Sequence, residues 1–402
     1  MDKTHRVLII GTMDTKGKET MFLKDCLEGE GLGVIIMDAG ILGQSPFPVD
    51  ISRDRVAEAA GSTLNEVQHI GHEGKALDVM IRGAIRFAGD LYEKREIDGI
   101  VEIGGSMGTT LGTAVMRTFP IGFPKVMIST MASKNTRPFV GTKDILMLHS
   151  VCDLSGLNRI TRKVIREGGL AVAGMVKGLK SNPIETSPLV VLSTLGTTEA
   201  CALKVREGIE KRGQEVITFH TVGSGGEAMD DLIRDQDVEM VVDLSLHEMG
   251  DHLFGGDYDA GPNRGLAALE KGVPTILVPG NTDFLVTGPL AAAKERFPGR
   301  RLHVHNAAIT ALATAPEEMK AIAGRIADMC RSARGPVSIL IPMGGFSAFD
   351  SPGGPLESPE IREVFSQALR ADLPAGIRCN ESSQHINDPE FAESILEAID
   401  RF

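Results

Sequence analysis

Two short segments of the sequence combine glycine with hydroxyl-bearing and charged residues, a composition suited to holding an anion. The first is GTMDTKGK, residues 11–18. Small residues allow backbone N–H groups to approach phosphate oxygens, hydroxyls can bond to those oxygens, and a lysine neutralises their charge. The segment is not a Walker A loop, because Gly17 comes one residue late and Lys18 is followed by Glu19. Its candidate ligand-binding residues are Gly11, Thr12, Asp14, Thr15 and Lys16.

The second segment is GGSMGTT, residues 104–110, between an apolar run and a helical pattern whose first turn is expected near Thr109. Glycines permit a sharp turn there, and a helix N-terminus with hydroxyls beside it favours an anion through hydrogen bonds and the helix dipole. The spacing is not G-x-G-x-x-G, so it does not indicate a dinucleotide in particular. Its candidate ligand-binding residues are Gly104, Gly105, Ser106, Gly108, Thr109 and Thr110.

An acidic residue at the end of another apolar run completes this set. Asp38 lies where a carboxylate often holds a ribose hydroxyl in nucleotide-binding sheets. Ligands of open parallel sheets bind outside the carboxyl ends of the strands, so the loops 11–18, 38–45 and 104–110 are expected to converge at one mouth. The alternative is that these residues form ordinary turns and helix caps that bind nothing.

The second half of the chain concentrates titratable side chains in the segments 244–264 and 302–306. HEMGDH is not a zinc-protease motif, because its histidines are five residues apart and zinc on a helix needs them four apart. If the loops converge, an acid–base or metal site would use His247, Glu248, Asp251, His252, His303 and His305. The alternative is a solvated loop with hydrogen-bonded histidines. The glycine-rich segment 223–233 is a further candidate anion site.

The pattern of apolar residues indicates the elements that position these segments. Continuous apolar runs ended by glycine, as in RVLIIG, are typical of parallel strands buried on both faces. Strand–helix–strand alternation predicts an open parallel sheet with right-handed crossovers. The predicted strands of the first half are 6–11, 33–40, 98–105 and 124–130, and its predicted amphipathic helices include 17–30 and 78–97.

The same order restarts after the polar segment 180–188, the expected linker. Residues 7–34 overlie 189–216 without a gap, and 121–130 overlie 271–280. We therefore predict an α/β fold with two tandem Rossmann-like domains, each an open, mostly parallel sheet with helices on both faces. The expected domains are 1–183 and 184–402. A duplication would explain the likeness, and the alternative is that any buried strand followed by a helix produces this pattern.

Composition and charge limit the classes of partner. The formal net charge of −12 argues against nucleic acid, whose binding needs lysines and arginines clustered on one face. No apolar run approaches the roughly 18 residues that span a bilayer, and the N-terminal residues lack a secretory signal pattern. The five cysteines form no C-x-x-C pair, as expected of reduced thiols. We therefore expect a cytoplasmic protein with no nucleic-acid or membrane partner.

Several motifs, in this order, resemble one known family. They include VLIIGTMDTKGKE, GGSMGTT, FPIGFPKVMISTMAS, GTKDILMLHSVCDLSGLNRITR, FHTVGSGGEAMDDLI, SAFDSPG and HINDPEFA. The sequence is similar to the Tm-one-like ATP-binding proteins, relatives of the N-terminal region of the tomato mosaic virus resistance protein. The resemblance implies two Rossmann-like domains, a homodimer or larger homo-oligomer, and ATP with Mg²⁺ in the first domain. By motif, that binding role falls on the candidate residues of 11–18 and 104–110.

Three functions are consistent with these features. The first is an ATP- and Mg²⁺-dependent enzyme (an ATPase, ligase or kinase-like protein) that acts on a small metabolite at a cleft between the domains. The second is a non-catalytic module in which ATP regulates assembly or partner binding. The third is a metal-dependent hydrolase that uses the acids and histidines of the second domain. The clustered acids and imidazoles favour the first of these.

Overall fold

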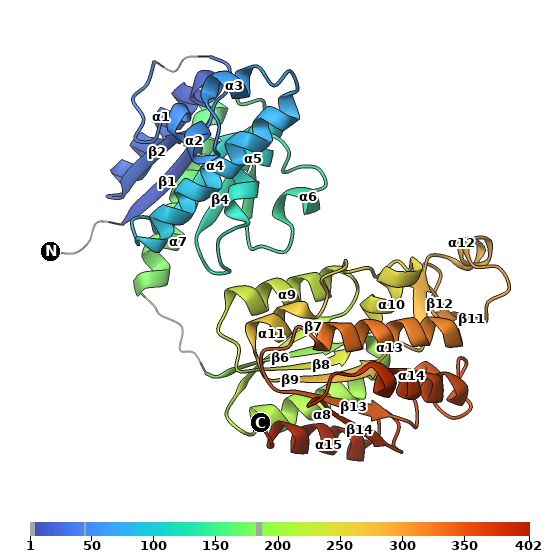
Figure 1. Cartoon of the computed structure of the whole chain (residues 1–402). Coiled ribbons are helices and arrows are strands. Elements are labelled where there is room, and N and C mark those ends of the chain that lie inside the picture. Colours follow the sequence, from blue (N-terminus) through green and yellow to red (C-terminus); the bar gives the residue numbers. More distant parts are fainter. Residues whose placement is uncertain (1–4, 44–45, 182–186) are drawn as a thin grey trace. The chain divides into compact units, whose positions relative to one another are not determined.

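The computed structural model describes residues 5–43, 46–181 and 187–402, and the chain divides into two compact units, Met1–Ile184 and Glu185–Phe402 (Figure 1). The predicted boundary between residues 183 and 184 lies in 182–186, outside the described residues. Each unit contains an open parallel sheet with helices on both faces. This architecture confirms the predicted α/β fold class.

The first unit contains a five-stranded sheet in the order β2-β1-β3-β4-β5, with every pair parallel. The chain leaves β1 toward β2 on one side and returns to β3 on the other. The carboxyl ends of β1 and β3 therefore border the crevice in which open sheets bind ligands. The strands are β1 (Arg6–Gly11), β2 (Gly33–Asp38), β3 (Gly99–Gly104), β4 (Lys125–Ser129) and β5 (Leu146–His149).

Helices cover both faces of this sheet. α1 and α7 pack together on one face, and α2, α4 and α5 pack on the other. The helices are α1 (Met13–Gly29), α2 (Arg53–Ala59), α3 (Leu64–Gln68), α4 (Glu73–Glu93), α5 (Ser106–Met116), α6 (Arg137–Val140) and α7 (Arg159–Ser181).

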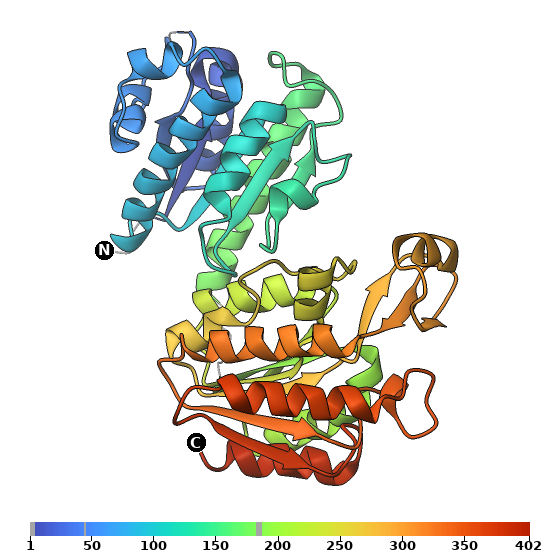
Figure 2. The ribbon, with the colours of Figure 1, turned by 45° about the vertical axis from the view of Figure 1, so that its right-hand side comes forward.

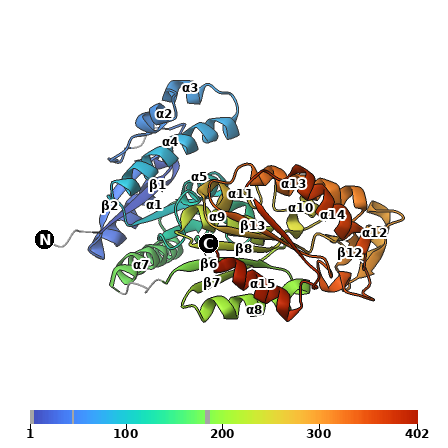
Figure 3. The same ribbon diagram turned by 60° about the horizontal axis from the view of Figure 1, so that its bottom comes forward.

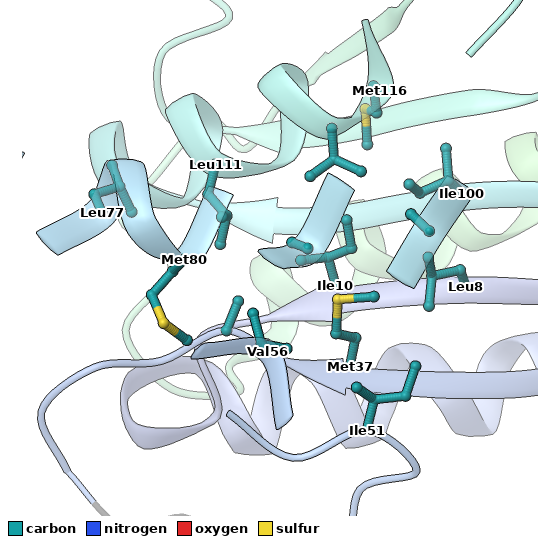
Figure 4. Packing of buried hydrophobic residues seen from close by; sticks show 14 of the residues in the cluster. Leu8, Ile10, Met37, Ile51, Val56, Leu77, Met80, Ile100, Leu111 and Met116 are labelled. Atoms are coloured by element: carbon teal, nitrogen blue, oxygen red, sulfur yellow. The ribbon is translucent and has the colours of Figure 1, made fainter. Parts of the chain in front are cut away.

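The core of this unit explains why β1 reads as a continuous apolar run. Leu8 and Ile10 point to the side of α2, α4 and α5, where they meet residues such as Met37 and Ile100 (Figure 4). Val7 and Ile9 point to the opposite face, toward α1 and α7. All four of these β1 side chains are completely buried. Each such burial stabilises the fold by about 1.5–3 kcal/mol.

Three helices begin earlier than the apolar pattern predicts. α1 begins at Met13 instead of residue 17, α5 at Ser106 instead of near 109, and α4 at Glu73 instead of 78. Their first turns are mostly polar, so the apolar periodicity starts one turn too late. The segments 11–18 and 104–110 are therefore helix N-termini and not open loops.

The second unit contains a six-stranded parallel sheet in the order β14-β13-β9-β8-β6-β7. It repeats the first unit's order with one more edge strand, and its crevice lies between β6 and β8. The segments that overlie each other in sequence form equivalent strands, since β6, β7 and β9 take the places of β1, β2 and β4. The strands are β6 (Leu189–Thr194), β7 (Glu215–His220), β8 (Met240–Ser245), β9 (Thr275–Gly280), β13 (Val337–Pro342) and β14 (Arg378–Ser382).

In this unit α8 and α15 pack on one face, and α9, α11, α13 and α14 lie on the other (Figure 3). Among the described residues, no helix of either unit is both long and apolar enough to cross a membrane. The helices are α8 (Glu199–Glu210), α9 (Ser224–Asp235), α10 (His247–Phe254), α11 (Leu266–Lys271), α12 (Leu290–Arg296), α13 (Pro316–Cys330), α14 (Pro359–Asp372) and α15 (Pro389–Ile399), with short 3₁₀ turns η1 (Gly196–Thr198) and η2 (Ala348–Asp350).

A small antiparallel sheet is inserted between β9 and β13 and projects, with α12, from one edge of the second unit (Figure 2). Its strand order is β10-β12-β11. These strands are β10 (Phe284–Thr287), β11 (Leu302–Val304) and β12 (Thr310–Ala313). The apolar pattern of the sequence does not predict this insertion.

Candidate functional site

A pocket of about 730 Å³ opens at the carboxyl ends of β1 and β3, at the crevice of the first sheet. All three segments that were expected to converge contribute to it, and Ala39, Ile41 and Leu42 represent the segment 38–45. Residues 44–45 of that segment lie outside the described residues. The predicted ligand-binding residues that line the pocket are Thr12, Asp14, Thr15, Lys16, Gly104, Gly105, Ser106 and Gly108.

The N-terminus of α5 opens into this pocket without a cap. Gly105 occupies the N-cap position and provides no side-chain cap, whereas the side chains of Ser52 and Thr63 cap α2 and α3. The first N–H groups of a helix have no partner within the helix, and the helix dipole makes this end positive. This end of α5 is therefore chemically suited to receive an anion from the pocket.

Gly104 allows the close turn that brings α5 to this position. A Cβ atom at Gly104 would lie 2.7 Å from the Cα of Gly108 and 2.9 Å from the backbone nitrogen of Thr109. Both neighbours are backbone atoms, which cannot move aside as a side chain can. Gly105 is different, because a Cβ there would meet only the Thr130 hydroxyl, at 3.9 Å.

Asp38 caps α1 and does not line the pocket. Its Oδ1 accepts hydrogen bonds from the backbone N–H groups of Met13 at 3.1 Å and Gly40 at 2.9 Å. Burial raises the pKa of Asp38, and those two backbone donors oppose the shift. The carboxylate thus fastens the end of β2 to the start of α1. A ribose contact from Asp38 stays a prediction.

Polar side chains of the first turn of α1 line the opposite side of the pocket. Asp14 Oδ2 accepts from the backbone N–H groups of Leu42, at 3.3 Å, and Gly43, at 3.0 Å. Asp14 Oδ1 is buried and has no hydrogen-bond partner among the described residues. The hydroxyls of Thr12 and Thr15 lie 2.9 Å apart. Asp14 therefore holds the segment after β2 through Oδ2, while its buried Oδ1 is left without a partner among the described residues.

Lys16 lies at a local irregularity in α1, with φ −121° and ψ 17°. Its Nζ donates to the backbone carbonyl of Leu154, in the segment that follows β5. An ammonium group has three donors, so this bond occupies only one of them. Lys16 is thus held at the pocket wall with donors to spare.

Besides Asp38, three predicted residues lie outside the pocket lining for identifiable reasons. A Cβ on Gly11 would be 3.1 Å from the Thr20 hydroxyl, so this glycine serves the packing of β1 against α1. Thr109 is completely buried, and its hydroxyl lies 2.6 Å from both the Gly105 carbonyl and the Ser129 hydroxyl. The exposed Thr110 donates to the Ser106 carbonyl at 3.0 Å. Both threonine hydroxyls are turned back onto their own helix and do not face the pocket.

The remaining wall of the pocket is largely apolar. None of its apolar residues was predicted to bind a ligand. Leu42 is 80% exposed, the highest value among the exposed large hydrophobic residues, although it lines the pocket. Gln68, His72 and Glu73 add polar groups at the rim. The apolar lining residues are Ala39, Ile41, Leu42, Val67, Ala76, Leu77 and Met107. The pocket therefore has one polar side and one hydrophobic side.

A buried acid, Glu102, lies directly behind this helix end. It belongs to β3 and is completely buried, and neither carboxyl oxygen has a hydrogen-bond partner among the described residues. Its side chain fits beneath α5 because a Cβ on Gly112 would lie 2.1 Å from Oε2. Burial raises the pKa of Glu102 well above its ordinary value of 4.5. The folded chain therefore retains the Glu102 proton to a higher pH than the unfolded chain does.

We predict that Glu102 makes the first unit less stable as the pH rises. The unfolded chain releases this proton near pH 4.5, while the folded chain keeps it, so stability falls from that pH up to the folded pKa. Glu102→Gln cannot ionise and should lose this pH dependence. Relative to the parent, the variant should therefore become more stable as the pH rises from 5 to 8. Urea unfolding at both pH values measures the difference, and parallel pH profiles of the two proteins would contradict it.

In the second unit, the predicted catalytic residue Glu248 is buried and bonded on both oxygens. Its Oε1 accepts from the backbone N–H groups of Gly223, at 2.6 Å, and Gly226, at 3.0 Å, at the start of α9. Its Oε2 accepts from Arg264 Nε at 2.6 Å. In this structure a carboxylate of the chain occupies the N–H groups of the candidate anion site at 223–233, and a catalytic role for Glu248 stays a prediction.

Arg264 is the centre of this network, and it was not among the predicted site residues. Its Nη1 and Nη2 donate to the two oxygens of Asp243 at 2.7 and 2.8 Å, a bidentate pair at the end of β8. Both residues are about 2% exposed. Asp243 also accepts from the Ser193 hydroxyl of β6, at 2.6 Å. These ion pairs and hydrogen bonds therefore link β6, β8 and α9 at the crevice of this sheet.

His247 and Asp251 are also completely buried. Asp251 accepts from the backbone N–H groups of Tyr258, at 2.8 Å, and Val286, at 3.1 Å, which fixes two loops around α10. His247 Nε2 lies 3.4 Å from Asp251, and Nδ1 lies 2.8 Å from the Asn281 carbonyl. Burial lowers the pKa of His247, but Asp251, the Asn281 carbonyl and Glu248 together raise it by more, so the net shift is upward. Neither residue is accessible to a substrate in this arrangement.

The other three predicted histidines do not join one site with Glu248. His252 pairs with Asp259 at 2.9 Å and is 32% exposed. The rings of His303 and His305 lie 4.7 and 6.2 Å from that of Phe349. Within residues 5–43, 46–181 and 187–402, no three His, Cys, Asp or Glu side chains are grouped closely enough to hold a metal ion. A metal-dependent hydrolase therefore finds no ligand set of that size in the described chain.

Family models match both units. The model described as "Uncharacterised protein family (UPF0261) N-terminal domain" matches residues 5–181, and the C-terminal domain of the same family matches 187–402. The chain belongs to the UPF0261 family. A UPF0261 protein of Clostridium tetani is 36% identical over 398 residues, which are 98% of each chain.

The UPF0261 likeness extends to a plant protein. The ToMV resistance protein Tm-1 of Solanum lycopersicum is 31% identical over 421 residues, covering 98% of this chain and 55% of the tomato protein. Among solved structures, MurG of Acinetobacter baumannii aligns with 99% of this chain and 100% of its own, at 12% identity and a TM-score of 0.24. That distant likeness indicates nothing about a ligand.

Proposed function

We propose that the first unit binds ATP in the pocket between the N-termini of α1 and α5. The observation that carries the proposal is the uncapped N-terminus of α5, which opens into a pocket of about 730 Å³ at the crevice of the sheet. Helix N-termini are ready-made phosphate sites, and this pocket volume is within the range of about 300–1,000 Å³ typical of small-molecule ligands. The triphosphate would lie against Gly105, Ser106 and Gly108.

The hydrophobic wall supports a nucleotide over a simple phosphate. Leu42, Val67 and Leu77 offer an apolar surface for the flat face of a base, and Gln68 can hydrogen-bond to its edge. Together these side chains form a contiguous apolar surface inside a pocket, as is typical of ligand sites. The choice of adenine over other bases comes from the resemblance to the ATP-binding proteins.

Mg²⁺ fits the polar side of the same pocket. This ion takes oxygen ligands and usually binds through one or two carboxylates together with phosphates of the substrate. Asp14 Oδ1 has no hydrogen-bond partner among the described residues, and the hydroxyls of Thr12 and Thr15 lie on the same turn. Asp14 and these hydroxyls would hold the ion, which would neutralise phosphate charge when bound.

Calorimetric titration with a graded series of ligands tests the proposal. We expect affinity to fall from ATP to ADP to AMP, with adenosine weakest, because each phosphate removed loses contacts to the helix N-termini. GTP and CTP test the role of the base. Equal affinity for ATP and adenosine would contradict phosphate binding by α5, and the absence of any nucleotide binding would refute the function.

We predict that Lys16→Ala weakens ATP binding by about 1.5–3 kcal/mol, the value of a hydrogen bond to a charged group. The reason is the loss of a charge-assisted contact from a lysine at the pocket wall. Lys18→Ala is the matched control, since Lys18 is exposed and does not line the pocket. The same calorimetric titration measures both variants. Equal affinities of the two variants would show that Lys16 serves only to hold the Leu154 segment.

Consumption of ATP is an extension of this proposal. The sequence suggested ATP consumption through the cluster of acids and histidines in the second half. Several of these residues are buried in contacts within the fold. Measuring ATP turnover therefore distinguishes an ATP-dependent enzyme from a module whose assembly ATP regulates. Steady ATP hydrolysis, with or without added small acids, would favour the enzyme, and tight binding without turnover would favour the module.

A further inference from the structure

We propose that the second unit binds a small aromatic carboxylate in its own cavity, at the carboxyl ends of β6 and β7. The cavity has a volume of about 260 Å³, and every lining residue belongs to this unit. The proposal goes beyond nucleotide binding and does not depend on it. The lining residues are Leu195, Gly196, Thr197, His220, Tyr258, Phe284, Val286, His305, Ile309, Ala311 and Phe349.

The inserted antiparallel sheet builds the apolar wall of this cavity. Alternate residues of a strand share a face, so Phe284 and Val286 project together from β10, and Ala311 pairs with Val286 from β12. The ring of Phe349 meets that of Phe284 at 5.0 Å and 61°. The insertion thus supplies aromatic and aliphatic surface at the mouth of a parallel sheet, which is where such sheets bind ligands.

Buried acids hold the two phenylalanines in place. Asp283, next to Phe284, accepts from the Ser347 hydroxyl at 2.6 Å. Asp350, next to Phe349, accepts from the backbone N–H groups of Phe346, at 3.1 Å, and Ser358, at 2.8 Å. Both acids are completely buried. The aromatic wall is therefore fixed before a ligand arrives, which reduces the entropy that binding must overcome.

The opposite end of the cavity is polar and is also held rigidly. Asn281 adopts a left-handed conformation with φ 62°, which is uncommon for a residue with a side chain. From there its Nδ2 donates to the Thr197 hydroxyl at 2.5 Å, and Asn387 Nδ2 donates to the Thr197 carbonyl at 2.9 Å. Because the Thr197 oxygen already accepts a bond, its own hydrogen is left to donate to a ligand.

The kinds of polar group indicate the class of ligand. The cavity offers a hydroxyl from Thr197 and the imidazoles of His220 and His305. Its described lining includes no carboxylate side chain, so no acidic group of that lining would repel an anion. A carboxylate accepts hydrogen bonds only, and the Thr197 hydroxyl and imidazole N–H groups can supply them. These polar groups therefore suit a carboxylate.

The volume of the cavity and its aromatic lining indicate the apolar part of the ligand. A volume of about 260 Å³ lies below the range of about 300–1,000 Å³ that holds drug-sized molecules, so a single ring is the appropriate size. Aromatic side chains favour edge-to-face or offset contacts with another ring. Phe284, Tyr258 and Phe349 offer such contacts from three elements of the unit. An aromatic ring should therefore bind better than an aliphatic ring of equal size.

Saturation-transfer NMR with the full chain and benzoate tests the proposal, with cyclohexanecarboxylate, benzyl alcohol and uracil as matched probes. We expect benzoate to bind at least tenfold more tightly than each of the others. Equal binding of cyclohexanecarboxylate would overturn the aromatic part, and equal binding of benzyl alcohol would overturn the carboxylate part. Preference for uracil, or no benzoate signal at millimolar concentration, would overturn the proposal.

Two substitutions test whether benzoate binds in this cavity. Gly196→Val narrows the mouth, and no atom lies within 4 Å of the new Cβ, so the fold should be retained. His305→Leu removes a donor from an exposed position. Each should weaken benzoate binding at least tenfold and leave ATP affinity unchanged. His303→Leu is the control, since His303 touches Phe349 but does not line the cavity. Unaltered benzoate affinity in Gly196→Val and His305→Leu, or an equal loss in the control, would overturn the assignment.

Discussion

Replacing Gly105 by valine should abolish ATP binding by the first unit without unfolding it. Gly105 precedes α5, and a side chain there would keep phosphate oxygens away from the backbone N–H groups of the first turn. Its backbone is extended, with φ −80° and ψ −156°, a region that valine adopts readily. We expect affinity to fall about 100-fold or more, which corresponds to about 2.7 kcal/mol.

The measurement is calorimetric titration with ATP and MgCl₂, together with the melting temperature without nucleotide. Gly105→Val should melt close to the parent. Gly104→Val is the informative contrast, because its Cβ would lie 2.7 Å from backbone of Gly108 and should lower the melting temperature. A folded Gly105→Val protein that binds ATP normally would show that the N-terminus of α5 is not the phosphate site.

Replacing Arg264 by methionine should destabilise the second unit by about 3–5 kcal/mol, the usual cost of leaving a buried charge unpaired. The guanidinium pairs with both Asp243 and Glu248, and all three side chains are at most 2% exposed. Without it, two carboxylates remain in the interior with fewer donors. The loss should appear as an earlier urea transition, and hydrogen exchange of β8 peptides assigns that transition to the second unit.

Two comparisons separate charge from packing at Arg264. Arg296→Met breaks a surface pair with Asp257 in which both side chains are more than 40% exposed, so it should cost no more than about 1 kcal/mol. Adding Asp243→Asn and Glu248→Gln to Arg264→Met should recover part of the lost stability, because the unpaired charges are removed. A loss in Arg264→Met as small as in Arg296→Met would contradict the structural role of this network.

Much of the fold could be predicted because parallel strands buried on both faces leave an unmistakable pattern. The run from Val7 to Ile10 is continuous because its side chains alternate between two separate cores. The small sheet was missed for the opposite reason. β11 and β12 are 3 and 4 residues long, which is too short for alternation to be recognised.

The site residues were predictable only in part, because composition reveals which groups are present and not which groups they meet. Glycine and hydroxyl residues at the ends of β1 and β3 were visible, and the pocket brings most of them together. The cap that Asp38 gives to Met13 spans 25 residues, and the pairing of Glu248 with Arg264 spans 16. Such long-range partners decide whether an acid is bonded within the fold or free to meet a ligand. An arginine in the same segment as the acids was the one available signal.

The most direct test of the central claim is a crystal structure of the protein grown with ATP and MgCl₂. We predict phosphate density at the backbone of Gly105, Ser106 and Gly108, with the base against Leu42 and Leu77 and the metal beside Asp14. A nucleotide bound elsewhere on the protein, with this pocket empty, would contradict the account.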